Sequence, residues 1–159
     1  MTLRDHVERG PDGRYRIRAA GAVVSSIFPY QRSMKETLRA RLTMRGGRSA
    51  IQRELSKAGA VLCMESALEH YSSYFRPGRI CVYHQDPESL ARRFAPMVGG
   101  LIPVEIYLPD IPLDGDTEAE GRKGPLRTTR WRTLVDLASD GKLYVARDLL
   151  EQLWGIVLE

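Results

Sequence analysis

The chain has few of the features that tie a protein to a membrane, a disulfide framework or a zinc site. Its longest apolar run, residues 58–64, contains a glycine and is far too short to cross a bilayer. The charged N-terminus is followed by no apolar segment, so we expect no signal peptide, no membrane partner and a cytoplasmic location. The only two cysteines, Cys63 and Cys81, form no CxxC pair and lack zinc-ligand spacing, so we expect two buried thiols.

Sequence motifs for catalysis and cofactor binding are also missing. Gly46 and Gly47 are not followed by the Lys-Ser/Thr pair of a phosphate-binding loop, and they are better suited to ending a helix. On a helix, Cys63 and His70 would lie about 10 Å apart along the axis, too far for a nucleophile and its base. We therefore predict a protein that is not an enzyme, with no catalytic residue, no cofactor and no metal.

Acidic residues concentrate in the segment 109–125, which is rich in proline and glycine and is predicted to be an exposed loop. Asp114 and Asp116 lie there, followed by Glu118 and Glu120. A metal-dependent nucleic-acid enzyme that uses these carboxylates, with arginines as phosphate clamps, is an open alternative. A structural subunit of a larger complex is another. Activity lost in EDTA and in Asp116→Ala would favour the enzyme.

Positive charge is concentrated at the front of the sequence. Residues 1–60 hold 13 Lys or Arg against 5 Asp or Glu, a net charge of +8, while residues 61–159 carry −4. A basic segment joined to a mildly acidic body favours DNA or another polyanion as partner. The candidate nucleic-acid-binding residues are Arg14, Arg16, Arg18, Lys35, Arg39, Arg41, Arg45, Arg48 and Arg53.

The first of these arginines alternate with apolar residues. After the turn signal Pro11-Asp12-Gly13, residues 14–18 predict a short strand with one basic face, similar to the wing of a winged-helix domain. Such a wing would set cations against the anionic DNA backbone. Residues 23–28 predict a second strand, which Pro29 closes.

Helical signals follow. Ser33 and Glu36 form a capping box that predicts a helix up to about Arg45, with Leu38 and Leu42 on its apolar side. The remaining predicted elements are helices over 48–57, 60–74, 86–94, 131–137 and 143–153, and strands over 79–84, 102–108 and 126–130. This order predicts an α/β (α+β) fold, with a small mixed sheet flanked by helices behind a basic N-terminal strand-and-helix segment.

Two segments carry a resemblance to a known family. Residues 63–71 read Cys-Met-Glu-Ser-Ala-Leu-Glu-His-Tyr, and residues 128–137 read Thr-Thr-Arg-Trp-Arg-Thr-Leu-Val-Asp-Leu. Both resemble segments of abortive-infection antitoxins of the AbiEi type (type IV) and related transcriptional regulators. The resemblance covers about residues 58–155 and divides the chain into a basic segment, 1–58, and an α/β antitoxin-like domain, 59–159.

In that family a winged helix binds operator DNA, and the C-terminal domain supports repression and opposes a nucleotidyltransferase toxin. The resemblance therefore implies a regulatory binding protein without turnover, with such a toxin as a partner and a possible homo-oligomer. The chain departs from the family because only residues 5–18 correspond to part of a winged helix. Thr129, Arg132 and Asp136 are expected to hold the fold together, with Arg132 and Asp136 paired four residues apart on a helix.

Overall fold

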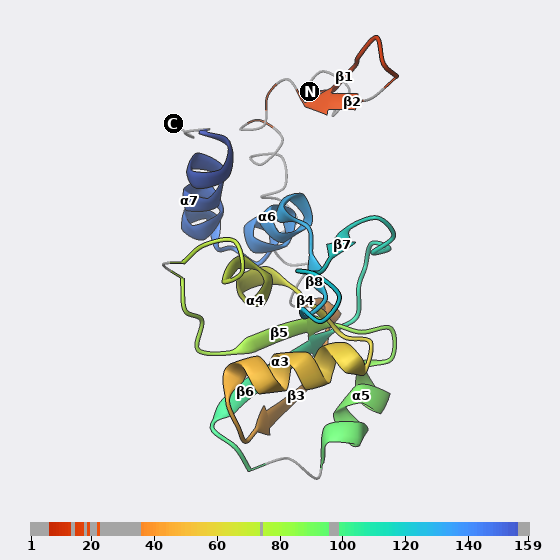
Figure 1. The fold of residues 1–159 in the computed structure, drawn as a ribbon, viewed down its shortest axis with the longest axis vertical. Coiled ribbons are helices and arrows are strands. Elements are labelled where there is room, and N and C mark those ends of the chain that lie inside the picture. The colour runs from red at the N-terminus through yellow and green to blue at the C-terminus, as the bar shows by residue number, and fades with distance from the viewer. Residues whose placement is uncertain are drawn as a thin grey trace.

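A computed structural model describes residues 7–13, 15–17, 19, 22, 36–73, 75–95 and 99–155. Its architecture is mixed α+β, with a six-stranded mixed sheet, helices packed against it, and a two-stranded ribbon near the N-terminus (Figure 1). This confirms the predicted fold class. The predicted strand over 23–28 lies outside the described residues, as do Arg14, Arg18 and Lys35.

The strands are β1 (Val7–Arg9), β2 (Tyr15–Ile17), β3 (Leu38–Met44), β4 (Val61–Leu62), β5 (Ile80–Tyr83), β6 (Ile102–Tyr107), β7 (Thr117–Glu118) and β8 (Arg127–Thr128). The helices are α3 (Arg48–Lys57), α4 (Met64–Leu68), α5 (Pro87–Phe94), α6 (Arg130–Ser139) and α7 (Leu143–Trp154). The large sheet has the order β3-β6-β5-β4-β8-β7, in which β5–β6 and β4–β8 are parallel pairs. β1 and β2 form the separate antiparallel ribbon, which contains the backbone of Arg16.

The helix predicted from Ser33 to Arg45 is wrong over most of its length, because residues 38–44 form β3. This strand pairs antiparallel with β6, where Arg41 faces Glu105 and Leu42 faces Val104. Alternate residues from Leu38 to Met44 turn toward the core, which is the two-residue period of a half-buried strand. Pairing with β6 satisfies the backbone of this segment and overrides its capping signal.

The helix predicted over residues 60–74 is wrong at both ends, because α4 covers only Met64–Leu68. Val61 and Leu62 form β4, which pairs antiparallel with β5 and parallel with β8. Cys63 then occupies the N-cap position of the short helix α4, without a side-chain capping hydrogen bond. The predicted helices over 48–57, 86–94, 131–137 and 143–153 are confirmed as α3, α5, α6 and α7, and the predicted strands over 79–84, 102–108 and 126–130 as β5, β6 and β8. The predicted loop 109–125 is mostly exposed, but it contains the short strand β7.

The sheet separates two apolar layers. On β5, Ile80 and Val82 pack with residues of α3 and α5, while Cys81 and Tyr83 pack with residues of α4, α6 and α7. Met44, Ile51 and Leu55 belong to the first layer. The boundary predicted after residue 58 therefore does not separate two packing units, because β3 and α3 share the sheet and core of the later residues.

Cys63 and Cys81 are fully buried free thiols, as predicted. Burial raises the pKa of both thiols well above the ordinary value, so neither is poised as a thiolate. Across the described segments, every helix is too short or too polar to span a lipid bilayer.

The start of α5 gives a first test of local structure. The Asp86 carboxylate accepts a hydrogen bond from the Ser89 backbone N–H at 2.9 Å, and Pro87 occupies the first helical position. We expect Asp86→Ala to lower the free energy of unfolding by about 1 kcal/mol, measured by urea denaturation. Asp86→Asn, which keeps an acceptor at the cap, should stay close to the parent chain; an equal loss in both variants would contradict a capping role.

Candidate nucleic-acid interface

The predicted arginines of β3 and the turn after it lie on the surface, each bonded to the protein. Arg39 is exposed and donates to the backbone carbonyl of Glu36. Arg41 contacts the Glu105 carboxylate, with 3.1 Å between Nε and Oε1. Arg45 donates to the carbonyl of Gly99 at 3.1 Å. These three side chains follow an edge strand of the sheet and do not converge on a cavity among the described residues.

Arg48 is placed differently from the prediction, because it turns inward at the start of α3. Its Nε lies 2.7 Å from Oε2 of Glu69, and its Nη2 donates to the carbonyl of Arg79 at 2.7 Å. Its side chain is only 24% exposed. A guanidinium held by three fixed partners, the third being the Ser66 hydroxyl, serves the packing of α3 against α4 rather than a ligand.

Two of the predicted cations line clefts, within the part of the chain that the structure describes. Arg48 lines one of about 400 Å³ together with its partner Glu69. A second cleft is lined by Arg53. This second cleft has a volume of about 760 Å³ and lies between α3 and the loop that joins β7 to β8. It is lined by Ala50, Arg53, Glu54, Ser56, Lys57, Ala119, Arg122, Lys123, Gly124, Pro125 and Leu126. It adjoins the β7–β8 edge of the sheet, whereas Arg39, Arg41 and Arg45 are at or near the β3 edge. We call it the basic cleft.

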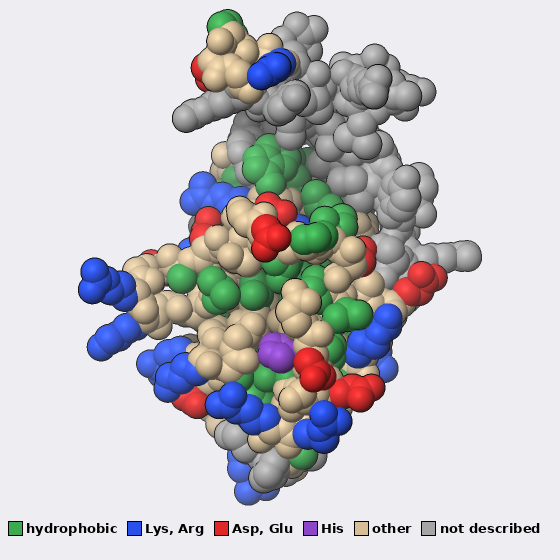
Figure 2. Space-filling model, turned by 90° about the vertical axis from the view of Figure 1, so that its right-hand side faces the viewer, with side chains coloured by type: hydrophobic (Ala, Val, Ile, Leu, Met, Phe, Trp, Pro, Cys, Tyr) green, Lys and Arg blue, Asp and Glu red, His purple; other side chains and the backbone are tan. Residues whose placement is uncertain are grey.

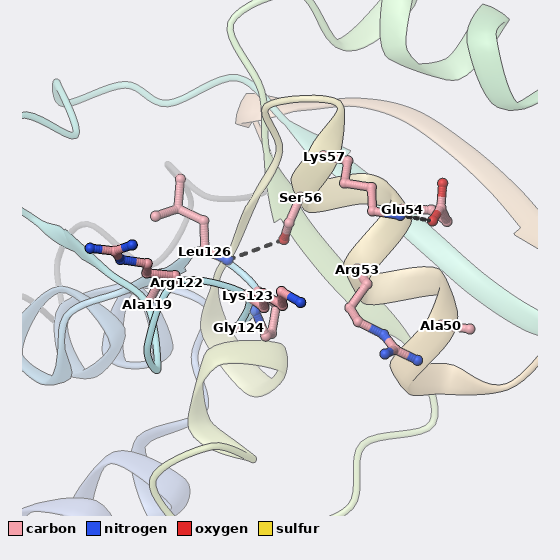
Figure 3. Close-up of a pocket in the computed structure, with 11 residues that line it drawn as sticks. Ala50, Arg53, Glu54, Ser56, Lys57, Ala119, Arg122, Lys123, Gly124 and Leu126 are labelled. Carbon is pink, nitrogen blue, oxygen red and sulfur yellow. Dashed lines mark hydrogen bonds and ion pairs between the residues drawn. The ribbon is translucent and has the colours of Figure 1, made fainter.

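The side chains of the basic cleft come from two walls (Figure 3). Arg53 and Lys57 project from α3, and Lys123 extends from the loop toward that helix. Arg122 points to the outer side of the loop. On the surface, Lys and Arg side chains gather over the lower half of one face of the molecule (Figure 2).

The shape of the basic cleft is fixed at its base. The Leu126 backbone N–H donates to the Ser56 hydroxyl at 3.1 Å, which ties the loop to the last turn of α3. In the loop, Gly121 has a φ of +65°, a backbone conformation that favours glycine. A side chain at Gly124 would place its Cβ only 2.4 Å from the carbonyl oxygen of Glu120. The two glycines therefore permit the tight turn that presents Arg122 and Lys123.

The basic cleft carries four cations and one carboxylate. Lys57 pairs with Glu54 at 2.7 Å, and this ammonium group holds the pKa of Glu54 below its ordinary value. Arg122 and Lys123 are exposed and form no ion pair with any side chain that the structure describes. Positive charge is thus left available to an anion that enters between the walls.

The sequence prediction missed Arg122 and Lys123 because it assigned them to an acidic loop. The pattern Gly121-Arg122-Lys123-Gly124, two cations between two glycines, is the signal that marks a basic turn. One of the acidic residues near it, Glu118, is engaged in the fold. Glu118 accepts from the Tyr71 hydroxyl at 2.8 Å and contacts the Arg127 guanidinium at 3.4 Å.

The carboxylates proposed for the alternative function, a metal-dependent nucleic-acid enzyme, do not converge. Nowhere in the described ranges do three His, Cys, Asp or Glu side chains come close enough together to hold a metal ion. Asp114 is exposed, and the backbone carbonyl of Asp116 accepts a hydrogen bond from Thr129 at 2.8 Å. The geometry therefore offers no assembled carboxylate site in this loop.

A second set of charges is buried away from the cleft. Arg79 contacts the carboxylates of Glu65 and Asp140, each at 3.2 Å, and also that of Glu105. Lys142 bridges Glu65 and Asp140. Burial alone would raise the pKa of Glu65, but Lys142 and Arg79 hold it below its ordinary value. This buried network joins β5, β6, α4 and the α6–α7 connection.

The segment 128–137 begins α6 and contains a buried ion pair. Thr129 caps the helix, and Nε of Arg132 lies 2.8 Å from Oδ1 of Asp136, which confirms the predicted pairing. Arg132 also lies over the ring of Tyr83. Burial raises the pKa of Asp136 to about 7, although Arg132 opposes the shift.

The fold and the cleft define the class of the molecule: a mixed α+β protein with a basic cleft between a helix and the tip of a β-hairpin. No protein-family model, curated protein or solved structure matches the chain. We infer the function of the protein from the charge and the shape of the basic cleft.

Proposed function

We propose that this chain is a regulatory protein of the antitoxin type, which acts by binding a polyanion, in the first place DNA, without turnover. The observation that carries the proposal is the basic cleft, where Arg53 and Lys57 of α3 face Lys123 of the loop, with Arg122 on the outer side of that loop. Cations gathered on two walls attract a phosphate backbone and release its counterions. The resemblance of residues 128–137 to the antitoxin family supports the regulatory role.

The binding residues of this proposal differ from those predicted from the sequence. Arg48 is committed to Glu69, so it contributes no phosphate contact. Arg39 and Arg45 are exposed near the other edge of the sheet and add only to the long-range attraction. The direct contacts are therefore assigned to the basic cleft.

Paired substitutions test this assignment. We expect Arg53→Ala with Lys123→Ala to weaken DNA binding by roughly tenfold for each cation at about 0.1 M salt, because each removes one phosphate contact. Fluorescence anisotropy with a labelled DNA measures the affinity, and circular dichroism checks folding. Arg39→Ala with Arg45→Ala is the matched control, since it removes the same charge elsewhere. Equal losses in the two double variants would contradict a role for the cleft.

The same protein sample also tests the alternative function, a metal-dependent nucleic-acid enzyme. Nucleic-acid cleavage that stops in EDTA and in Asp116→Ala would overturn a function without turnover. Binding that is unchanged in EDTA, without cleavage, is the expected result. A nucleotidyltransferase-type toxin is the proposed protein partner, and co-purification with such an enzyme is the direct test.

A structural subunit of a larger complex is the second candidate, and one surface favours it. A groove of about 150 Å³ runs between α7 and the residues around the end of α4, lined by Leu68, Phe75, Val145 and Leu149. Tyr144, 67% exposed, stands at its edge. Protein association that persists at high salt while DNA binding is absent would support this function instead.

A further inference from the structure

We infer that the basic cleft receives the sugar–phosphate backbone of duplex DNA, independently of base sequence, rather than an unpaired strand. This inference rests on the proposed function and names the form of nucleic acid that its site would take. It follows from what the lining residues are, which of their polar groups are already engaged, and how the cations are spaced.

Stacking is the first criterion. Proteins that bind single strands place bases against aromatic side chains, each stacked base contributing about 1–3 kcal/mol. Among the eleven lining residues, all within the described part of the chain, none is aromatic. The apolar part of the lining consists of small or aliphatic side chains from Ala50, Ala119, Pro125 and Leu126. An unpaired base would therefore find no ring to replace the stacking that it loses.

Hydrogen-bonding groups are the second criterion. Glu54 is paired with Lys57, and the Ser56 hydroxyl is engaged by the Leu126 backbone. The lining contains no Asn or Gln to read an adenine edge, and its other polar side chains are Arg and Lys. Arg and Lys can read a guanine edge in the major groove, but cations of a cleft that holds the sugar–phosphate backbone contact phosphate oxygens, which carry no sequence information. The expected binding is therefore positional and sequence-independent.

The spacing of the cations is the third criterion. Arg53 and Lys57 are four residues apart on α3, so their side chains leave the helix about 5–6 Å from each other. Lys123 faces them from the loop, which Ser56 and Leu126 hold in place. A duplex carries one charge per about 1.7 Å of axis, twice the density of one strand, so it can present phosphates to both walls together.

The test compares a duplex of about 20 base pairs with one of its strands, using the full chain and a salt titration. With three to four phosphate contacts, the slope of log K against log salt should be about −3 to −4 for the duplex and about −2 to −3 for the strand. These slopes predict about fivefold tighter duplex binding at 0.1 M salt. A duplex of unrelated sequence should bind equally.

Two variants test whether the salt dependence of duplex binding comes from the basic cleft. Lys123→Ala should reduce the magnitude of the duplex slope by about 0.9, whereas Arg147→Ala, which removes an exposed charge from α7, should leave it unchanged. A single strand bound as tightly as the duplex, with both lost in Lys123→Ala, would overturn the duplex assignment and leave the proposed function standing. Absence of binding to either DNA or heparin at low salt would overturn both.

Discussion

Replacement of Arg79 by methionine is expected to lower the free energy of unfolding by about 3–5 kcal/mol, one of the two largest effects predicted for this chain. The guanidinium touches the carboxylates of Glu65, Glu105 and Asp140, whose side chains are only 6–12% exposed. Methionine keeps the apolar stem but leaves three neighbouring carboxylates with less compensating charge. Urea unfolding, followed by circular dichroism, measures the loss.

Two further variants serve as controls for Arg79→Met. Arg92→Ala removes an equal charge from an exposed pair with Glu88 on α5 and should change stability by less than about 0.5 kcal/mol. Arg79→Lys keeps the charge but lacks the planar fork that reaches three carboxylates at once, so its loss should be intermediate. If Arg79→Met cost no more than Arg92→Ala, the buried network would not be a source of stability.

The same network shows why charge counted along a sequence is an unreliable guide to a binding surface. Arg48 belongs to the basic segment and Arg79 to the mildly acidic body, yet each is occupied by carboxylates from other elements. Their partners lie up to 61 residues away, as for Arg79 and Asp140. Only the sheet topology brings such groups together, and the sequence pattern does not contain it.

The strand β3 shows a different limit. Leu38 and Leu42 are four residues apart, so they fit one face of a helix as well as one face of a strand. Ala40 and Met44 complete the alternation, but the capping box at Ser33 and Glu36 favoured the helical interpretation. The partner that decides the matter, β6, lies some 60 residues further along the chain.

Local signals were sufficient where structure depends on neighbours in the sequence. The predicted helices 48–57, 86–94 and 131–137 are confirmed, and Gly59, Asp86 and Thr129 lie at or next to their ends. The basic cleft could be predicted only in part. Arg53 was among the candidate residues, but its meeting with Lys123 depends on the Ser56–Leu126 hydrogen bond, which joins segments 70 residues apart.

The second large effect is expected at the ion pair inside α6. Arg132→Met should lower the free energy of unfolding by about 3–5 kcal/mol at pH 8 and by much less at pH 5. In the folded chain, burial raises the pKa of Asp136 to about 7, from an ordinary value of 3.8. The folded state therefore holds the proton more tightly than the unfolded state, and this group loses stabilising effect as pH rises from about 4 through 7. Without Arg132 the buried carboxylate has lost its nearest cation, so the penalty above pH 7 grows.

Asp136→Asn isolates this titration, because an amide does not ionise and the pH dependence that comes from Asp136 should disappear. The comparison is needed because His70 also titrates. Burial lowers the pKa of His70, so its contribution to the free energy of unfolding rises with pH up to about 6.5, opposite to that of Asp136. His70 is the same in both proteins, so the difference between them reports Asp136 alone. Urea unfolding at pH 5, 6, 7 and 8 gives that difference. A destabilisation of Arg132→Met that is constant from pH 5 to 8 would mean that Asp136 does not change its protonation state in this range, and would contradict the prediction.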